Sequence, residues 1–331
     1  MNKIYKYLLL ALLPLLTIGC RHHEITDDMP DSVKLELLDI NLERDPDNAE
    51  LLAARAKVLF RLHKLNEAAF DIKRALDADP DNLEYLLLKA DISFANGNIE
   101  GSYQTLETAE RLSPDNQEVQ LKMGEITFYS RDYDRSLKYL SKVTERDANN
   151  RTALFMKGFI YKETGDTANA IQLLRKVCDL HPDYEPAFEE LGILFASRHD
   201  PMALEYLGTA LRLEPNNTNA LYGMAMYYQD LNKTDKAEEI YKQILDINDN
   251  HKEAWHNRGY IEMFTYGDYP EAINFFTRAI QCDSTFIEAW TNRGCAYELM
   301  GDKQHALDDF QSALQLDHTF QPAIDGLNRV K

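Results

Sequence analysis

This 331-residue chain has few of the residues that interrupt helices or build metal sites. It contains 14 glycines and 11 prolines, which fits a helical chain joined by short turns. Its four cysteines show no C-x2-C spacing, so a zinc site of that kind is not expected. The G-x-S-x-G, H-E-x-x-H, Walker A and G-x-G-x-x-G motifs are absent as well. We therefore expect no enzymatic activity, no catalytic residues, no cofactor and no metal.

Positive charge is also scarce. The chain has 36 Lys plus Arg against 55 Asp plus Glu, a formal net charge of -19. Such a surface repels phosphate backbones, so a nucleic-acid partner is not expected. The hydrophobic content of 44% and charged content of 27% are those of a soluble folded protein rather than a disordered one.

The N-terminal stretch Met1 to Cys20 has the pattern of a targeting segment. Lys3 and Lys6 supply a positive end, and the apolar run from Leu8 to Ile18 follows them. That run is too short to span a bilayer comfortably and fits the apolar region of a secretory signal. We predict a signal peptide over residues 1–19.

The end of this stretch, Leu16-Thr17-Ile18-Gly19-Cys20, resembles the lipobox of bacterial lipoproteins, although Thr17 departs from the usual Leu. The resemblance implies cleavage before Cys20, lipidation of its thiol and a lipidated tether over residues 20–30. Arg21 after the cysteine favours, by the same resemblance, an outer-membrane anchor with the protein facing the periplasm of the bacterial cell envelope. The alternative is an ordinary signal peptide in which Cys20 is incidental.

Near the other end, residues 287–320 form two short amphipathic patterns around a break at Gly301-Asp302. Each pattern places three residues at i, i+4 and i+7, on one face of a helix. The residues are Trp290, Gly294 and Tyr297, then Ala306, Phe310 and Ala313. This spacing resembles the tetratricopeptide (TPR) repeat, a helix-turn-helix unit of 34 residues.

The same register extends over eight units covering residues 49–320. Small residues recur at positions 8 and 20 of the unit, and a bulky one at position 24, as close packing of two helices requires. The fifth unit loses one residue in its turn, and the seventh gains one in the turn at 265–270. The units start at Ala49, Leu83, Gln117, Arg151, Glu185, Thr218, Lys252 and Ile287.

Residues 31–48 predict an N-terminal capping helix and linker, and residues 321–331 a C-terminal capping helix. The expected fold is therefore all-α: a right-handed superhelical solenoid of about eight TPR units with capping helices at both ends. The superhelical form is what the resemblance implies.

The resemblance also implies that positions 2, 5, 9, 12 and 13 face a concave groove. In units four to seven these positions carry apolar and aromatic side chains, and exposed apolar surface marks binding sites. The predicted partner-binding residues are Phe155, Phe159, Ile193, Tyr222, Met226, His256, Tyr260, Met263 and Phe264. The alternative is that these side chains pack between neighbouring units. Asn257 and Asn292 resemble the asparagines with which some TPR proteins hold a peptide backbone.

These observations predict a membrane-anchored TPR adaptor that binds a segment of a partner protein in its groove without catalysis. The alternative is a self-associating structural component of an envelope assembly or secretion complex, with the aromatic faces buried in a homodimer. The lysine and asparagine pattern of TPR proteins that bind acidic peptide C-termini is missing. Cys282 and Cys295 are expected to serve packing, with a disulfide between them as the alternative.

Overall fold

The computed structural model describes residue 26 and residues 28–331. Within these residues the chain forms eighteen α-helices in tandem and one π-helix, with no strand, which confirms the expected all-α fold. None of the described helices is both long and apolar enough to cross a bilayer. The predicted signal peptide and Cys20 lie outside the described residues.

The first helix of each pair begins at the residue from which the sequence register counts its unit. The helices are α1 (Asp31–Arg44), α2 (Ala49–Arg61), α3 (Leu65–Ala78), α4 (Leu83–Ala95), α5 (Ile99–Leu112), α6 (Gln117–Tyr129), α7 (Tyr133–Arg146), α8 (Arg151–Glu163), α9 (Thr167–Leu180), α10 (Glu185–Ala196), α11 (Met202–Leu213), α12 (Thr218–Asp230), α13 (Thr234–Ile247), α14 (Lys252–Ile261), η1 (Glu262–Tyr266), α15 (Tyr269–Cys282), α16 (Ile287–Met300), α17 (Lys303–Leu316) and α18 (Gln321–Val330).

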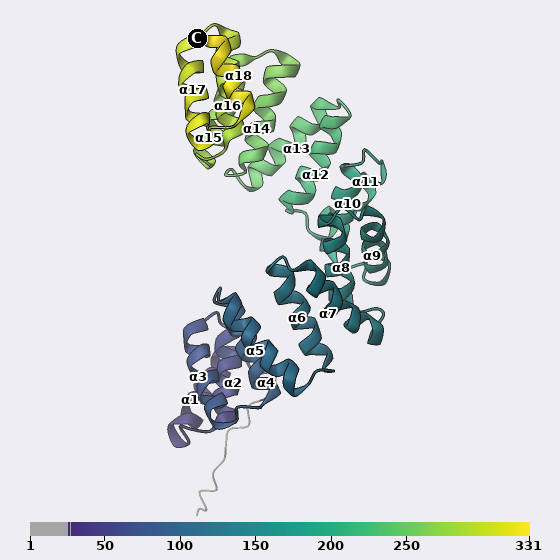
Figure 1. The fold of residues 1–331 in the computed structure, drawn as a ribbon, viewed down its shortest axis with the longest axis vertical. Helices are drawn as coiled ribbons and strands as arrows, with labels where there is room; N and C mark the ends of the chain where they lie inside the picture. The colour runs from purple at the N-terminus through teal and green to yellow at the C-terminus, as the bar shows by residue number, and fades with distance from the viewer. Residues whose placement is uncertain (1–25, 27) are drawn as a thin grey trace, which may run out of the picture. The chain divides into compact units, whose positions relative to one another are not determined.

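The chain divides into two compact units, one ending at Tyr139 and the other beginning at Leu140, so that α7 crosses the division. In each unit the core follows the helix pairs, with α2 packed on α3 and α4 on α5 in the first, and α10 on α11 and α12 on α13 in the second (Figure 1). The largest cluster of buried side chains in the second unit includes Leu174, Leu191 and Leu207. Cys178, Cys282 and Cys295 are free thiols, so the disulfide alternative is not formed.

Asparagine is the N-cap residue of most of the first helices. At these positions the side-chain oxygen accepts a hydrogen bond from a backbone N–H of the first turn, which satisfies a donor that the helix leaves unpaired. The N-cap asparagines are Asn48, Asn82, Asn116, Asn150 and Asn217. This recurring cap explains why helix starts keep the repeat spacing.

Each helix pair is closed by a turn containing one residue in the left-handed backbone region. These residues are His63, Gly97, Arg131, Gly165, His199, Asn232, Gly267 and Gly301. A side-chain-bearing residue pays a conformational cost there. The same backbone reversal is therefore imposed at all eight turns, whether or not the residue is glycine.

Close approach between the two helices of a pair explains the small residue at position 8. A Cβ added at Gly192 would lie 2.6 Å from Leu207 Cγ and 2.9 Å from the Leu207 backbone nitrogen. At Gly259 it would lie 2.8 Å from Cε1 of Phe276. At Gly192 and Gly259 only glycine leaves room for the facing side chain.

The sequence predicts that the extra residue of the seventh unit lies in the turn. In the structure it lies within the first helix. There the chain widens into the π-helix η1, Glu262–Tyr266, before Gly267 reverses it. A π-helix has more residues per turn than an α-helix. After Ile261, the α-helical repeat positions therefore no longer predict which way a side chain points. Met263 is 5% exposed and packs with Ala272 and Phe276. The expectation that Met263 faces an open groove is therefore wrong.

The close packing of α10 against α11 in repeat five can be tested by substituting two glycines of this helix pair. We expect Gly192→Ala to lower the free energy of unfolding by about 1–3 kcal/mol, because Leu207 backbone atoms cannot yield to the new methyl group. Gly208 lies in α11 with nothing within 4 Å of an added Cβ. Gly208→Ala should raise stability by about 0.5–1 kcal/mol through helix propensity. Urea denaturation followed by circular dichroism measures both, and a Gly192→Ala variant as stable as the unchanged protein would contradict the packing argument.

Candidate functional site

A cleft of about 660 Å³ opens on the second unit, over the first helices of repeats four to six. Most of its wall comes from α10 and α12, which pack against one another, and α8 contributes Lys162. The lining residues are Lys162, Glu189, Glu190, Ile193, Ala196, Ser197, His199, Asn219, Tyr222, Gly223, Met226, Tyr227 and Asp230.

The apolar part of this cleft contains three of the residues predicted from the sequence. Ile193 of α10 and Tyr222 and Met226 of α12 are half-buried and all line it. Gly223 lets α12 lie close to α10 here, since a Cβ added to it would lie 3.1 Å from Ile193 Cγ1. The result is a concave apolar surface bounded by polar groups, as in binding sites for peptides and small molecules.

The single lysine of the cleft is already paired. Lys162 Nζ lies 2.6 Å from Glu190 Oε2 and 3.6 Å from Glu163 Oε1. It also lies 4.3 Å from the centre of the Phe159 ring, a cation–π distance. Burial raises the pKa of Glu190, while the hydrogen bond from Lys162 opposes this shift. Lys162 is therefore held in place by carboxylates of the protein itself.

The other acidic groups have weaker partners. The Asn217 side-chain amide donates to Glu189 Oε2 at 2.5 Å and to Glu185 Oε1 at 2.8 Å. Burial, followed by repulsion from Glu189, raises the pKa of Glu185 to about 7, against the opposing hydrogen bond from Asn217. Asp230 Oδ2 lies 3.6 Å from His199 Nδ1. Three carboxylates and one lysine thus line the cleft.

A hydrogen-bonded network behind the cleft fixes the Tyr222 ring. The Asn257 amide donates to the hydroxyl oxygens of Tyr222, at 3.1 Å, and of Tyr241, at 3.0 Å. The Tyr241 hydroxyl in turn donates to Gln229 Oε1 at 2.9 Å. Burial raises the pKa of both tyrosines, so their hydroxyls stay protonated and act as hydrogen-bonding groups. Repeats six and seven are joined by this network.

His256 extends the network to repeat eight. Its Nε2 lies 2.9 Å from the Asn292 amide nitrogen, and its Nδ1 lies 3.2 Å from Asn257 Oδ1. Burial lowers the pKa of His256, and the contacts fit a neutral ring that accepts at Nε2 and donates at Nδ1. Asn257 is 9% exposed, so its predicted role in holding a partner's backbone is wrong: its amide is committed within the protein. Asn292 likewise contacts His256.

The remaining predicted groove residues lie outside the cleft lining. Phe155 packs edge-on against Tyr184, with ring centres 5.3 Å apart, and Phe159 lies beneath Lys162. Phe155 thus contacts the residue just before α10, whereas the contact of Phe159 with Lys162 lies within α8. Tyr260 and Phe264 form an exposed pair with ring centres 4.4 Å apart, and their exposed fractions are 41% and 58%. They make a separate apolar surface at η1.

Several lining residues were not singled out from the sequence, although the register contained the signal. Lys162, Glu189, Ser197, Asn219 and Asp230 occupy groove-facing positions of their repeats. Their side chains are polar, whereas the prediction rested on apolar character at these positions. Both the charge and the apolar area of the cleft follow from the same register.

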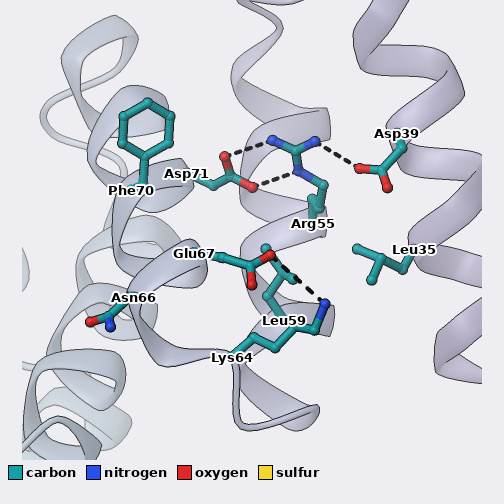
Figure 2. A pocket seen from close by; sticks show the side chains of 9 residues that line it. All are labelled: Leu35, Asp39, Arg55, Leu59, Lys64, Asn66, Glu67, Phe70 and Asp71. Atoms are coloured by element: carbon teal, nitrogen blue, oxygen red, sulfur yellow. Dashed lines mark hydrogen bonds and ion pairs between the residues drawn. The ribbon is translucent and has the colours of Figure 1, made fainter.

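A second cleft, of about 410 Å³, lies in the first unit (Figure 2). There Arg55 of α2 lies between two acids, donating to Asp71 of α3 at 2.6 and 2.8 Å and to Asp39 of α1 at 2.8 Å. The same fork recurs where Arg293 donates to Asp309 at 2.8 and 2.7 Å. Bidentate pairs of this kind fix one helix against the next. We assign Arg55 a structural role.

The network behind the cleft predicts unequal effects of two asparagine substitutions. Asn257→Ala removes the partner of two tyrosine hydroxyls and of His256, and should lower the free energy of unfolding by about 2 kcal/mol. Asn292→Ala removes one contact to a half-buried ring and should cost about 1 kcal/mol or less. Urea denaturation of both variants provides the comparison. Equal small losses would show that the network does not join the repeats.

The chain matches three family profiles described as tetratricopeptide repeat. One covers residues 287–320, a second covers residues 59–126 and 202–257, and a third covers residues 121–185. Together they extend along most of the helix pairs.

Among curated proteins, the chain is 27% identical over 144 residues to superkiller protein 3 of Schizosaccharomyces pombe, covering 41% of this chain and 10% of that protein. It is 26% identical over 137 residues to protein FlbA of Caulobacter vibrioides, covering 41% of this chain and 23% of FlbA. The aligned segments therefore span only a small part of these relatives.

The solved structures that resemble this chain support its fold and nothing further. A tetratricopeptide repeat protein from Parabacteroides merdae superposes with a TM-score of 0.59 at 18% identity, over 75% of this chain and 98% of that one. The APC/C hetero-tetramer Cut9-Hcn1 gives a TM-score of 0.60 at 18% identity, over 89% of this chain and 58% of the other. The repeat profiles, which together match more than half of the chain, show that the chain belongs to the tetratricopeptide-repeat proteins.

Proposed function

We propose that this protein is a membrane-anchored adaptor that binds a segment of a partner protein in the cleft between α10 and α12. The observation that carries the proposal is the cleft itself, with its apolar surface of Ile193, Tyr222 and Met226. The TPR scaffold is compatible with protein–protein interaction, and apolar and polar groups converge in this cleft.

The arrangement suits binding. A partner side chain placed against Ile193 and Met226 would leave water, and burial of one aliphatic side chain is worth about 1.5–3 kcal/mol. Asn219 is exposed on the cleft wall, and its amide can both donate to and accept from an extended backbone. An adaptor of this kind localises its partner and needs no chemical step.

The anchor is the second part of the proposal. The lipobox resemblance at residues 16–20 supports lipidation of Cys20, and the polar stretch to residue 30 would separate the first helix from the membrane. Several acyl chains on one cysteine meet the requirement of more than one lipid signal for stable attachment. We propose that the anchor holds the protein on the outer membrane of a bacterial envelope, facing the periplasm.

Two cleft variants test the binding site. Asn219→Trp should fill the cleft from an exposed position without disturbing the core, and Ile193→Asn should remove apolar contact. Crosslinked partner recovered from membranes should fall about ten-fold for each, a loss of about 1.4 kcal/mol in binding. Leu180→Asn, at a 40% exposed position of α9, is the matched control. Full recovery of every partner by folded Asn219→Trp protein would show that the cleft is not the binding site.

The anchor has its own test. Cys20→Ser removes the thiol that would carry the lipid, so the protein should move from the membrane fraction to the soluble fraction. Metabolic labelling with a palmitate analogue should label the unchanged protein and not the variant. Unchanged partitioning of Cys20→Ser would contradict the lipoprotein interpretation while leaving the cleft proposal intact.

A further inference from the structure

We infer that the cleft between α10 and α12 selects a basic-apolar segment, in which a Lys or Arg side chain lies beside an aliphatic one. The inference rests on the proposed function and goes further, because it names the chemistry of the occupant. It follows from which charges of the cleft are already neutralised and which are not.

The positive charge of the cleft is not available to an anionic partner. Lys162 Nζ has Glu190 at 2.6 Å and Glu163 at 3.6 Å, so an incoming carboxylate would have to displace protein carboxylates to reach it. An acidic segment would also approach Glu189 and Asp230, and like charges in a partly desolvated cleft repel. The cleft therefore disfavours acidic segments.

The two remaining carboxylates lack a permanent cation. Glu189 accepts a hydrogen bond from Asn217, a neutral amide that leaves its charge in place. The Asp230 side chain is 38% exposed, and its contact is His199 at 3.6 Å, which is charged only when protonated. Within the described part of the chain, no lysine or arginine is paired with either carboxylate. Each keeps lone pairs for an ammonium or guanidinium group.

The apolar surface complements this charge. Lys and Arg carry long aliphatic stems that cover apolar surface while the charged head reaches polar groups. A stem against Ile193 and Met226 would carry its head along a cleft that Glu189 and Asp230 also line. An aliphatic neighbour in the segment would use the rest of the apolar surface beside Tyr222. A basic-apolar segment thus complements both the apolar surface and the carboxylates of the cleft.

Three fluorescein-labelled peptides test this selection. They share a short Gly-Ser background and carry Leu-Lys-Leu, Leu-Gln-Leu or Leu-Glu-Leu at the centre. Fluorescence anisotropy with the full chain in mild detergent should show the Lys peptide binding about ten-fold more tightly than the Gln peptide, with the Glu peptide weakest. The preference should shrink as salt is raised from about 0.05 M to about 0.5 M.

Variants locate the source of the preference. Glu189→Gln combined with Asp230→Asn should bring the Lys and Gln peptides to about equal affinity. Asp179→Asn combined with Glu205→Gln is the matched control, because it removes the same charge from exposed positions of α9 and α11. This control should keep the preference.

The outcomes separate the inference from the proposed function. Equal binding of all three peptides, blocked by Asn219→Trp, would overturn the charge selection and leave the cleft as a binding site. A preference that persists in the Glu189→Gln, Asp230→Asn variant would also overturn it. Failure of all three peptides to bind would count against both the selection and the cleft.

Discussion

The close contact between the two helices of each repeat is the constraint on which the rest of the structure depends. Where Gly192 faces Leu207 or Gly259 faces Phe276, one methyl group more would separate the helices. Such contacts set the direction of each pair and hence the position of the next. Because first helices of neighbouring repeats then pack together, α10 and α12 can form a cleft from residues about one repeat apart in the sequence.

The binding properties of the cleft depend on which of its charged and polar side chains have partners within the protein. Lys162 is neutralised by Glu190, and the Tyr222 ring is fixed by Asn257. Glu189 and Asp230 have no lysine or arginine partner within the described residues. A rigid apolar surface beside carboxylates of this kind loses little conformational entropy when it binds, because its side chains are already ordered. The network from Tyr222 to Asn292 is therefore part of the site, although most of it lies behind the surface.

The sequence predicted the helix pairs well because size rules at fixed spacing determine them locally. It predicted the cleft only in part. Ile193, Tyr222 and Met226 line it, but Asn257 and Met263 are internal because of contacts that no repeat position records: a network spanning several repeats, and a π-helix that changes the register. Lys162 and Asp230 were within reach of the same register. Self-association and the lipid anchor remain predictions.

The left-handed residue that closes every hairpin has an evolutionary consequence. Repeat five has lost a residue next to His199, and repeat seven has gained one that is absorbed as η1 just before Gly267. In both, the second helix still begins after the same reversal. Insertions and deletions in or just before these bends can thus be inherited without disturbing neighbouring repeats. Gene duplication followed by such small edits would let one repeat acquire a new surface while the others keep theirs.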